Sequence, residues 1–117
     1  RSLQAIVIDD ERFEGYRRSA DFIQKHIFPG GLLPSPKTMR QEATAAGFDW
    51  HAHDKLGIDY AETLARWRAR FDAAAERVYE MGFDERFRRC WTYYLSYCEG
   101  GFRAGNIDTL QVALTRR

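Results

Sequence analysis

The hydrophobic pattern of the chain is organised around residues 56–81, where apolar side chains recur at steps of three and four positions. This spacing places them on one face of a helix and leaves the arginines and glutamates on the other faces. The apolar stripe consists of Tyr60, Leu64, Trp67, Phe71, Ala74 and Val78. After Gly57, Asp59 and Glu62 have the spacing of a capping box, so we expect the helix to begin there and to continue to Met81.

A second long amphipathic helix is predicted towards the C-terminus. Gly82 ends the preceding helix and Asp84 provides a cap for this one. Its apolar stripe consists of Phe87, Trp91, Tyr94, Leu95, Cys98 and Phe102. Gly100 and Gly101 weaken the pattern and Gly105 ends it.

Two shorter helices are predicted in the first half of the chain. Ser19 offers a cap for the first, which ends at the Pro-Gly-Gly turn of residues 29–31. Ser35 caps the second, and Pro36 occupies its favoured first position.

Three strands complete the pattern. Residues 3–8, LQAIVI, are rich in β-branched residues, as in a strand buried on both faces, and the charged residues 9–18 that follow are interpreted as a connector. Residues 48–53 alternate between apolar and polar positions, and residues 106–115 form the last strand. Strands interleaved with helices predict an α/β architecture, but three strands make a poor parallel sheet by themselves. We therefore expect a piece of a larger domain.

Composition and charge narrow the class of protein. At 117 residues and 13.7 kDa, residues 1–117 fit a single domain, and 18 basic against 17 acidic residues argue against a nucleic-acid binder. Cys90 and Cys98 lie about 12 Å apart on the predicted helix, too far for a disulfide. No apolar run approaches the roughly 18 residues of a membrane span. These features predict a reduced, cytoplasmic protein.

Few residues suggest chemistry by position alone. Tyr60 stands in the first turn of its helix, where its ring can pack inward while its hydroxyl reaches a polar pocket, although a buried structural tyrosine is the simpler interpretation. His51 and His53 would supply two metal ligands, with a third from His26 or an acid, and a solvent-facing strand edge is the simpler alternative. Cys98 lies on the apolar stripe and is interpreted as a small buried residue.

The glycine pairs and the FPGGLL segment of residues 28–33 are further candidates for ligand sites. Neither glycine pair lies between a strand and a helix N-terminus, so the sequence contains no nucleotide-binding fingerprint. FPGGLL either tucks over the sheet or forms the lip of an apolar pocket or a membrane-touching edge. On the second interpretation, Phe28, Leu32 and Leu33 are candidate substrate-binding residues.

These stretches together resemble the C-terminal part of the cyclopropane-fatty-acyl-phospholipid synthases, which are S-adenosylmethionine-dependent methyltransferases and include the mycolic acid cyclopropane synthases. The matching stretches are DFIQKHIFPGGLLPS (21–35), DYAETLARWRARF (59–71) and GFDERFRRCWTYYLSYCEGGFRAGNIDTLQVAL (82–114). They follow in order over nearly the whole chain. The resemblance implies the C-terminal part of a class I methyltransferase fold, with about three strands and four helices and the last strand antiparallel between the other two.

The resemblance also implies an activity. The family transfers a methyl group from S-adenosylmethionine to a cis double bond of a phospholipid acyl chain, and bound bicarbonate removes a proton so that a cyclopropane ring closes. Its bicarbonate-binding positions match Tyr60, within GIDY, together with Gln4 and Ile6. The cofactor would be bound mainly by sequence upstream of this chain, which is therefore expected to be inactive alone.

One position departs from the family pattern, because Gln4 stands where the family has histidine. An amide can donate a hydrogen bond to an anion but cannot share a proton as imidazole does. Either the basicity of bicarbonate is tuned differently, or the reaction is another alkene modification, such as methylation without ring closure. A non-catalytic, cytosolic protein-interaction module is the alternative from another class.

The expected partners follow from the same resemblance. They are phospholipid acyl chains, the inner membrane face through peripheral contact, and the missing N-terminal part of the same enzyme. No nucleic acid is expected.

Overall fold

The structure is a computed structural model that describes residues 1–19 and 21–117, without the side chains of residues 52 and 53. Its strands are β1 (Ser2–Ile8), β2 (Phe48–Lys55) and β3 (Ile107–Arg116). Its helices are η1 (Asp10–Arg12), α1 (Phe13–Arg18), α2 (Phe22–His26), α3 (Pro36–Ala45), α4 (Gly57–Ala73), α5 (Ala75–Glu80) and α6 (Glu85–Arg103). The expected α/β class is confirmed.

The strands form one sheet in the order β1-β3-β2, with β3 antiparallel to both of its neighbours. The last strand therefore occupies the central, antiparallel position expected for it. Along β1, Gln4 lies opposite Gln111 and Ile8 lies opposite Ile107. The register of β2 shifts between Trp50 and His53, which interrupts the simple alternation that the sequence predicts.

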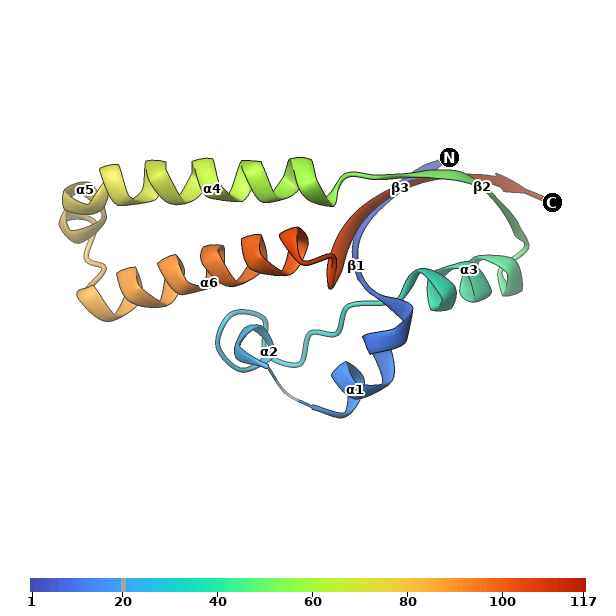
Figure 1. Ribbon diagram of the computed structural model, residues 1–117, viewed down its shortest axis with the longest axis horizontal. Coiled ribbons are helices and arrows are strands. Elements are labelled where there is room, and N and C mark those ends of the chain that lie inside the picture. The colour runs from blue at the N-terminus through green and yellow to red at the C-terminus, as the bar shows by residue number, and fades with distance from the viewer. Residues whose placement is uncertain (20) are drawn as a thin grey trace.

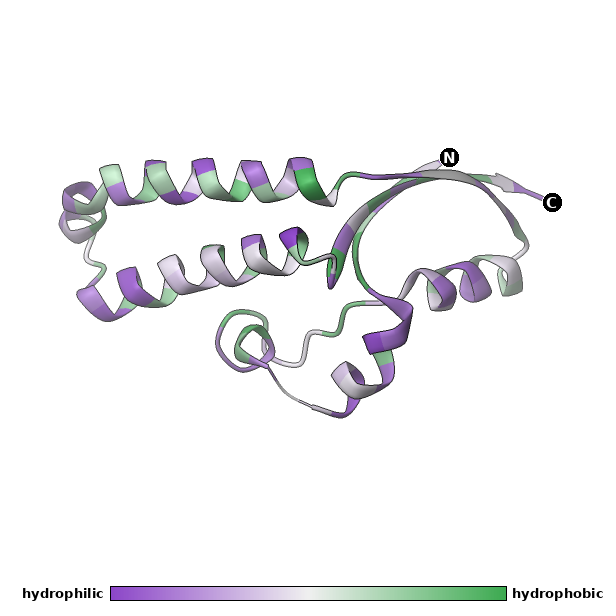
Figure 2. Cartoon of the chain, in the orientation of Figure 1, coloured by the Kyte–Doolittle hydropathy of each residue, from purple (hydrophilic) through white to green (hydrophobic). Residues whose placement is uncertain are grey.

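Helices α4 and α6 lie side by side and antiparallel, and they extend away from one end of the sheet (Figure 1). Hydrophilic and hydrophobic residues alternate along both helices (Figure 2). Their facing sides form a core of Ala61, Leu64, Leu95, Cys98 and Phe102. The hairpin makes the chain elongated, with extents of 53 × 28 × 25 Å.

The prediction of one continuous helix over residues 59–81 is wrong. It is divided at Ala74, whose N–H is shared between the carbonyls of Arg70 and Phe71, and α5 turns out of the line of α4 (Figure 1). A straight helix over residues 57–80 would be about 36 Å long, compared with about 28 Å for α6. Its last turn would have no partner, whereas the bend keeps α5 in contact with α6. The apolar stripe is only partly buried, and Trp67 on α4 is 46% exposed.

The start of α4 also differs from the expectation. The helix begins at Gly57, two residues before Asp59, and Leu56 at its N-cap makes no side-chain cap. Asp59 is therefore not the cap, and Glu62 pairs with Arg66 at 3.2 Å instead of closing a capping box.

Two predictions for the first 35 residues are wrong. The segment interpreted as a connector contains η1 and α1. Ser19 does not cap α2, because its hydroxyl donates to the Gly15 carbonyl at the end of α1. Asp21 caps α2 instead, and Gln24 completes a capping box. These two residues satisfy the first backbone N–H groups of α2 locally.

The other predicted caps are confirmed. The Ser35 side chain accepts a hydrogen bond from the Thr38 N–H at the start of α3, and Pro36 is the first helical residue. At the start of α6, the Asp84 carboxylate accepts from the Phe87 N–H at 2.9 Å. Local sequence therefore decides where both helices begin.

Candidate functional site

Tyr60 lies in the first turn of α4 and is half-buried. Its ring is 5.1 Å from the ring of Phe102 on α6 and 6.2 Å from that of Trp67. Among the described residues, no side chain forms a hydrogen bond with its hydroxyl group. The ring is thus fixed by aromatic contacts, and the hydroxyl is available to donate to a ligand.

Gln4 and Ile6 share one face of β1, because they are two residues apart on a strand. The Gln4 Oε1 atom accepts a hydrogen bond from Gln111 Nε2 at 2.8 Å. Strand β1 ends at Ile8, at the same end of the sheet where α4 begins, while Gln4 lies about 13 Å further back. The start of α4 and the end of β1 therefore lie at the same end of the sheet with β3 between them, while the Gln4 side chain is engaged within the sheet. Their joint role stays a prediction.

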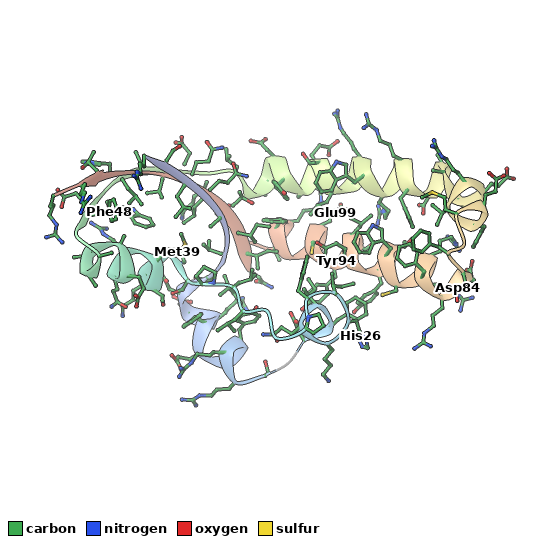
Figure 3. The ribbon with its side chains drawn as sticks, turned by 180° about the vertical axis from the view of Figure 1, so that it is seen from behind. His26, Met39, Phe48, Asp84, Tyr94 and Glu99 are labelled. Carbon is green, nitrogen blue, oxygen red and sulfur yellow. The ribbon has the colours of Figure 1, made fainter. Side chains whose placement is uncertain are left out.

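The FPGGLL segment presents apolar side chains on the surface. Phe28 is 58% exposed and Leu32 is 50% exposed, while Leu33 is half-buried and its N–H donates to the Tyr16 hydroxyl at 2.8 Å. Tyr94 projects from α6 towards this segment (Figure 3), and its ring centroid is 6.3 Å from that of Phe28.

Tyr60 and Tyr94 both pack against the hairpin core of α4 and α6.

An apolar cavity of about 430 Å³ lies between α2, the end of β1 and α6. Its apolar lining comes from Ile8, Ile23, Leu33 and Ile107. This volume lies within the roughly 300–1,000 Å³ that small-molecule sites occupy. Leu33 is the candidate substrate-binding residue that lines it.

Tyr97 lines the same cavity and was not identified from the sequence. Its hydroxyl donates to Asp21 Oδ2 at 3.1 Å, which ties α6 to the cap of α2. Burial, followed by the Asp21 carboxylate, raises the pKa of Tyr97 to about 12, so the phenol stays protonated at neutral pH. No sequence pattern marks this residue, because its partner lies 76 positions away.

The cysteines differ in their surroundings. Cys98 is 9% exposed, which confirms it as a small buried residue, and burial raises the pKa of its thiol to about 11. Cys90 is half-buried, and both cysteines are free.

We expect a thiol-alkylating reagent at pH 8 to modify Cys90 and to leave Cys98 largely unmodified. With a pKa near 11, only about one Cys98 thiol in a thousand is ionised at that pH, and the thiolate is the reactive form. Peptide mass mapping measures the two modifications separately. Urea provides the control, because both cysteines should react once the chain is unfolded; equal modification of the folded protein would contradict the burial of Cys98.

His26 lies on α2, whereas His51 and His53 lie on β2. The His51 Nε2 atom is 2.6 Å from Thr115 Oγ1, and the His26 ring packs on Phe22 at 5.1 Å. The His53 side chain lies outside the described residues. Over the part of the chain that is described, no three His, Cys, Asp or Glu residues are grouped as metal ligands.

The strongest electrostatic cluster lies at the far end of the hairpin. Arg88 forms an ion pair with Glu85 at 2.9 Å, and the Tyr79 hydroxyl also donates to Glu85. These hydrogen bonds, that of Arg88 first, lower the pKa of Glu85 to about 2. The cluster is exposed and distant from the cavity, so we interpret its perturbed pKa values as structural.

The glycine pairs serve packing and turns. Gly100 and Gly101 lie inside α6, where a Cβ atom at Gly101 would be 3.1 Å from Ile107 Cδ1. Gly30 lies after α2 with a φ of +77°. Neither pair connects a strand to a helix, so these residues do not form a cradle for a nucleotide cofactor.

None of the described helices combines the length and the apolar character that crossing a bilayer requires.

Comparisons with known proteins agree on one family. A sequence profile described as mycolic acid cyclopropane synthetase matches residues 2–112. A tuberculostearic acid methyltransferase of Mycobacterium tuberculosis is 40% identical over 98% of this chain, and a cyclopropane-fatty-acyl-phospholipid synthase of Escherichia coli is 42% identical over 81%. The chain spans 27% and 24% of the length of these two relatives.

The fold agrees with a solved structure as well. A crystal structure of a mycolic acid cyclopropane synthase complexed with SAH and CTAB superposes with a TM-score of 0.84 and 29% sequence identity. The match covers 97% of this chain and 42% of that one.

Proposed function

This chain belongs to the mycolic acid cyclopropane synthetase family, and from that premise we propose that it is the C-terminal portion of an S-adenosylmethionine-dependent enzyme that modifies phospholipid acyl chains. Its relatives are lipid methyltransferases and cyclopropane synthases. The specific reaction in this proposal is methylene addition to a cis double bond, which gives a cyclopropane ring. The phospholipid substrate is supported by the similarity to the Escherichia coli synthase.

The shape of the chain supports its assignment as one portion of a larger domain. Its radius of gyration is 16.7 Å, compared with about 13–14 Å for a compact domain of this length. Within the described residues β1 has a partner only on its β3 side, and Leu3 and Ile6 on it are 43% and 36% exposed. We propose that upstream sequence covers β1 and binds most of the cofactor, so that this chain alone is inactive.

The observation that carries the proposal is the position of Tyr60 in the first turn of α4, at the end of the sheet where β1 also ends and where an apolar cavity adjoins β1. An acyl chain is apolar, and a cavity lined by Ile23, Leu33 and Ile107 can exclude water from it. S-adenosylmethionine, when bound, supplies the methyl group. In this proposal the Tyr60 hydroxyl donates a hydrogen bond that orients an anionic base, bicarbonate, towards the acyl carbon that loses a proton.

Methylation without ring closure is a second candidate reaction, favoured by Gln4. Its amide replaces the proton-sharing imidazole of the family and is already bonded to Gln111. The similarity to a tuberculostearic acid methyltransferase over 98% of the chain agrees with this alternative.

The expected location follows from the substrate. We propose a cytoplasmic enzyme that touches the inner membrane face through the exposed side chains of Phe28 and Leu32.

The proposal is tested by expressing the complete polypeptide that contains this chain in Escherichia coli cells without their own synthase. After the cells are fed methyl-labelled methionine, we expect labelled one-carbon additions in membrane phospholipid acyl chains, measured by mass spectrometry. Gas chromatography separates cyclopropane from methyl-branched products and so decides between the two reactions. Unlabelled acyl chains would contradict the enzyme and favour the protein-interaction module.

A further inference from the structure

Helix α4 is anchored at its start by a residue from another element. The Oδ1 atom of Asp108, on β3, accepts a hydrogen bond from the Gly57 N–H at 2.8 Å and another from the Thr109 N–H at 2.8 Å. Leu56 at the N-cap contributes no side-chain bond. A carboxylate 51 positions further along the chain thus replaces the local cap and also faces the positive end of the helix dipole.

Gly57 is matched to this carboxylate in size. It is buried, and a Cβ atom placed on it would be 2.6 Å from Asp108 Oδ1 and 3.4 Å from Phe102 Cδ1. A real Cβ atom cannot approach an oxygen so closely. Any other residue at this position would displace the carboxylate from the helix start.

Backbone hydrogen bonds connect the start of α4, which Asp108 holds, with Tyr60. The Leu56 N–H donates to the Thr109 carbonyl at 2.9 Å, and the Tyr60 N–H donates to the Leu56 carbonyl at 2.9 Å. Together with the hydrogen bonds of Asp108, these contacts hold the first turn of α4 against Asp108 and Thr109, two adjacent residues of β3. The ring of Phe102 then confines the ring of Tyr60 from the side of α6.

We propose that Asp108 is a positioning residue for Tyr60, because its carboxylate holds the first turn of α4 against β3 and thereby places the tyrosine hydroxyl. This inference rests on the function proposed above. Asp108 does not touch the substrate, and its effect on the reaction passes through the location of the hydroxyl group. A displacement of about 1 Å at a reacting group can slow an enzyme about 100-fold.

The first test compares turnover in variants of the complete polypeptide. Asp108→Ala is expected to lower kcat about 10- to 100-fold with little change in KM for the phospholipid. Asp108→Asn keeps an oxygen acceptor and should restore most of the activity. Asp59→Ala is the matched control, because Asp59 is an exposed carboxylate in the same helical turn that does not cap the helix. Equal activity of Asp108→Ala and wild type would overturn the proposal.

The second test asks whether the effect passes through Tyr60. In a Tyr60→Phe background, Asp108→Ala should lower kcat less than about 3-fold, since the hydroxyl that it positions is already absent. A general loss of folding would lower kcat by the same factor in both backgrounds. That additive result would overturn the positioning role.

Amide hydrogen exchange separates this inference from the proposed function, because it does not depend on activity. Asp108→Ala should speed exchange of the Gly57 and Tyr60 amides about 10-fold or more, while Asp108→Asn and Asp59→Ala should not. Unchanged exchange of these amides in Asp108→Ala would contradict the proposal that Asp108 holds the start of α4, even if the enzyme is active. Faster exchange in a polypeptide whose wild type transfers no methyl group would leave the anchor in place and refute the proposed function.

Discussion

Replacing Tyr60 by phenylalanine in the complete polypeptide is expected to lower turnover about 100-fold and to leave the affinity for S-adenosylmethionine unchanged. The substitution removes one hydroxyl group and keeps the ring, so the contacts with Phe102 and Trp67 remain. If that hydroxyl orients the base that removes a proton, its loss acts on the chemical step. The cofactor is bound mainly by upstream sequence in our proposal and should not respond.

Two measurements test this result. Product formation from labelled S-adenosylmethionine gives kcat, and calorimetry gives the dissociation constant of the cofactor. Tyr79→Phe is the matched control, because Tyr79 loses the same hydroxyl at the far end of the hairpin, where it bonds to Glu85. Wild-type turnover in Tyr60→Phe would contradict a role for the Tyr60 hydroxyl in the reaction.

Phe102→Ala is expected to lower the free energy of unfolding by about 3–5 kcal/mol. Phe102 is 2% exposed and belongs to the core between α4 and α6. Its ring also contacts Tyr60, at 5.1 Å, and would meet any side chain added at Gly57. The substitution therefore removes buried apolar surface and leaves a cavity where the hairpin joins the sheet.

Urea denaturation of the complete polypeptide, followed by circular dichroism, measures this loss. Phe83→Ala provides the comparison, because Phe83 is 43% exposed and stacks on Phe87 near the tip of the hairpin. Its loss should cost about 1 kcal/mol or less. Similar costs for the two variants would show that Phe102 does not form part of the core.

The sequence predicted those features that depend on neighbouring residues. Ser35 and Asp84 cap their helices because a short polar side chain reaches an N–H three residues on, whatever the rest of the chain does. The periodicity of apolar residues likewise located the two helices of the hairpin. The central place of β3, however, came from the resemblance to the family, since strand order does not follow from the pattern within a strand.

Several of the features that were missed depend on contacts between distant residues. The start of α4 is decided by Asp108 on β3, and a local capping signal at Asp59 was therefore misleading. The bend at Ala74 occurs among alanines, which favour helix, because α6 is shorter than the combined length of α4 and α5. The placement of Gln4 opposite Gln111 also depends on strand pairing rather than on local sequence.

The central position of β3 has a consequence for synthesis on the ribosome. Among the described residues, the strand partner of both β1 and β2 is β3, and β3 is translated after both of them. Until residues 107–116 emerge, each of these strands lacks its β3 partner, and the backbone edge left open invites pairing with other nascent chains. Assembly of this three-stranded sheet therefore waits for the synthesis of β3, and its yield should depend on chaperones that shield β1 and β2 until then.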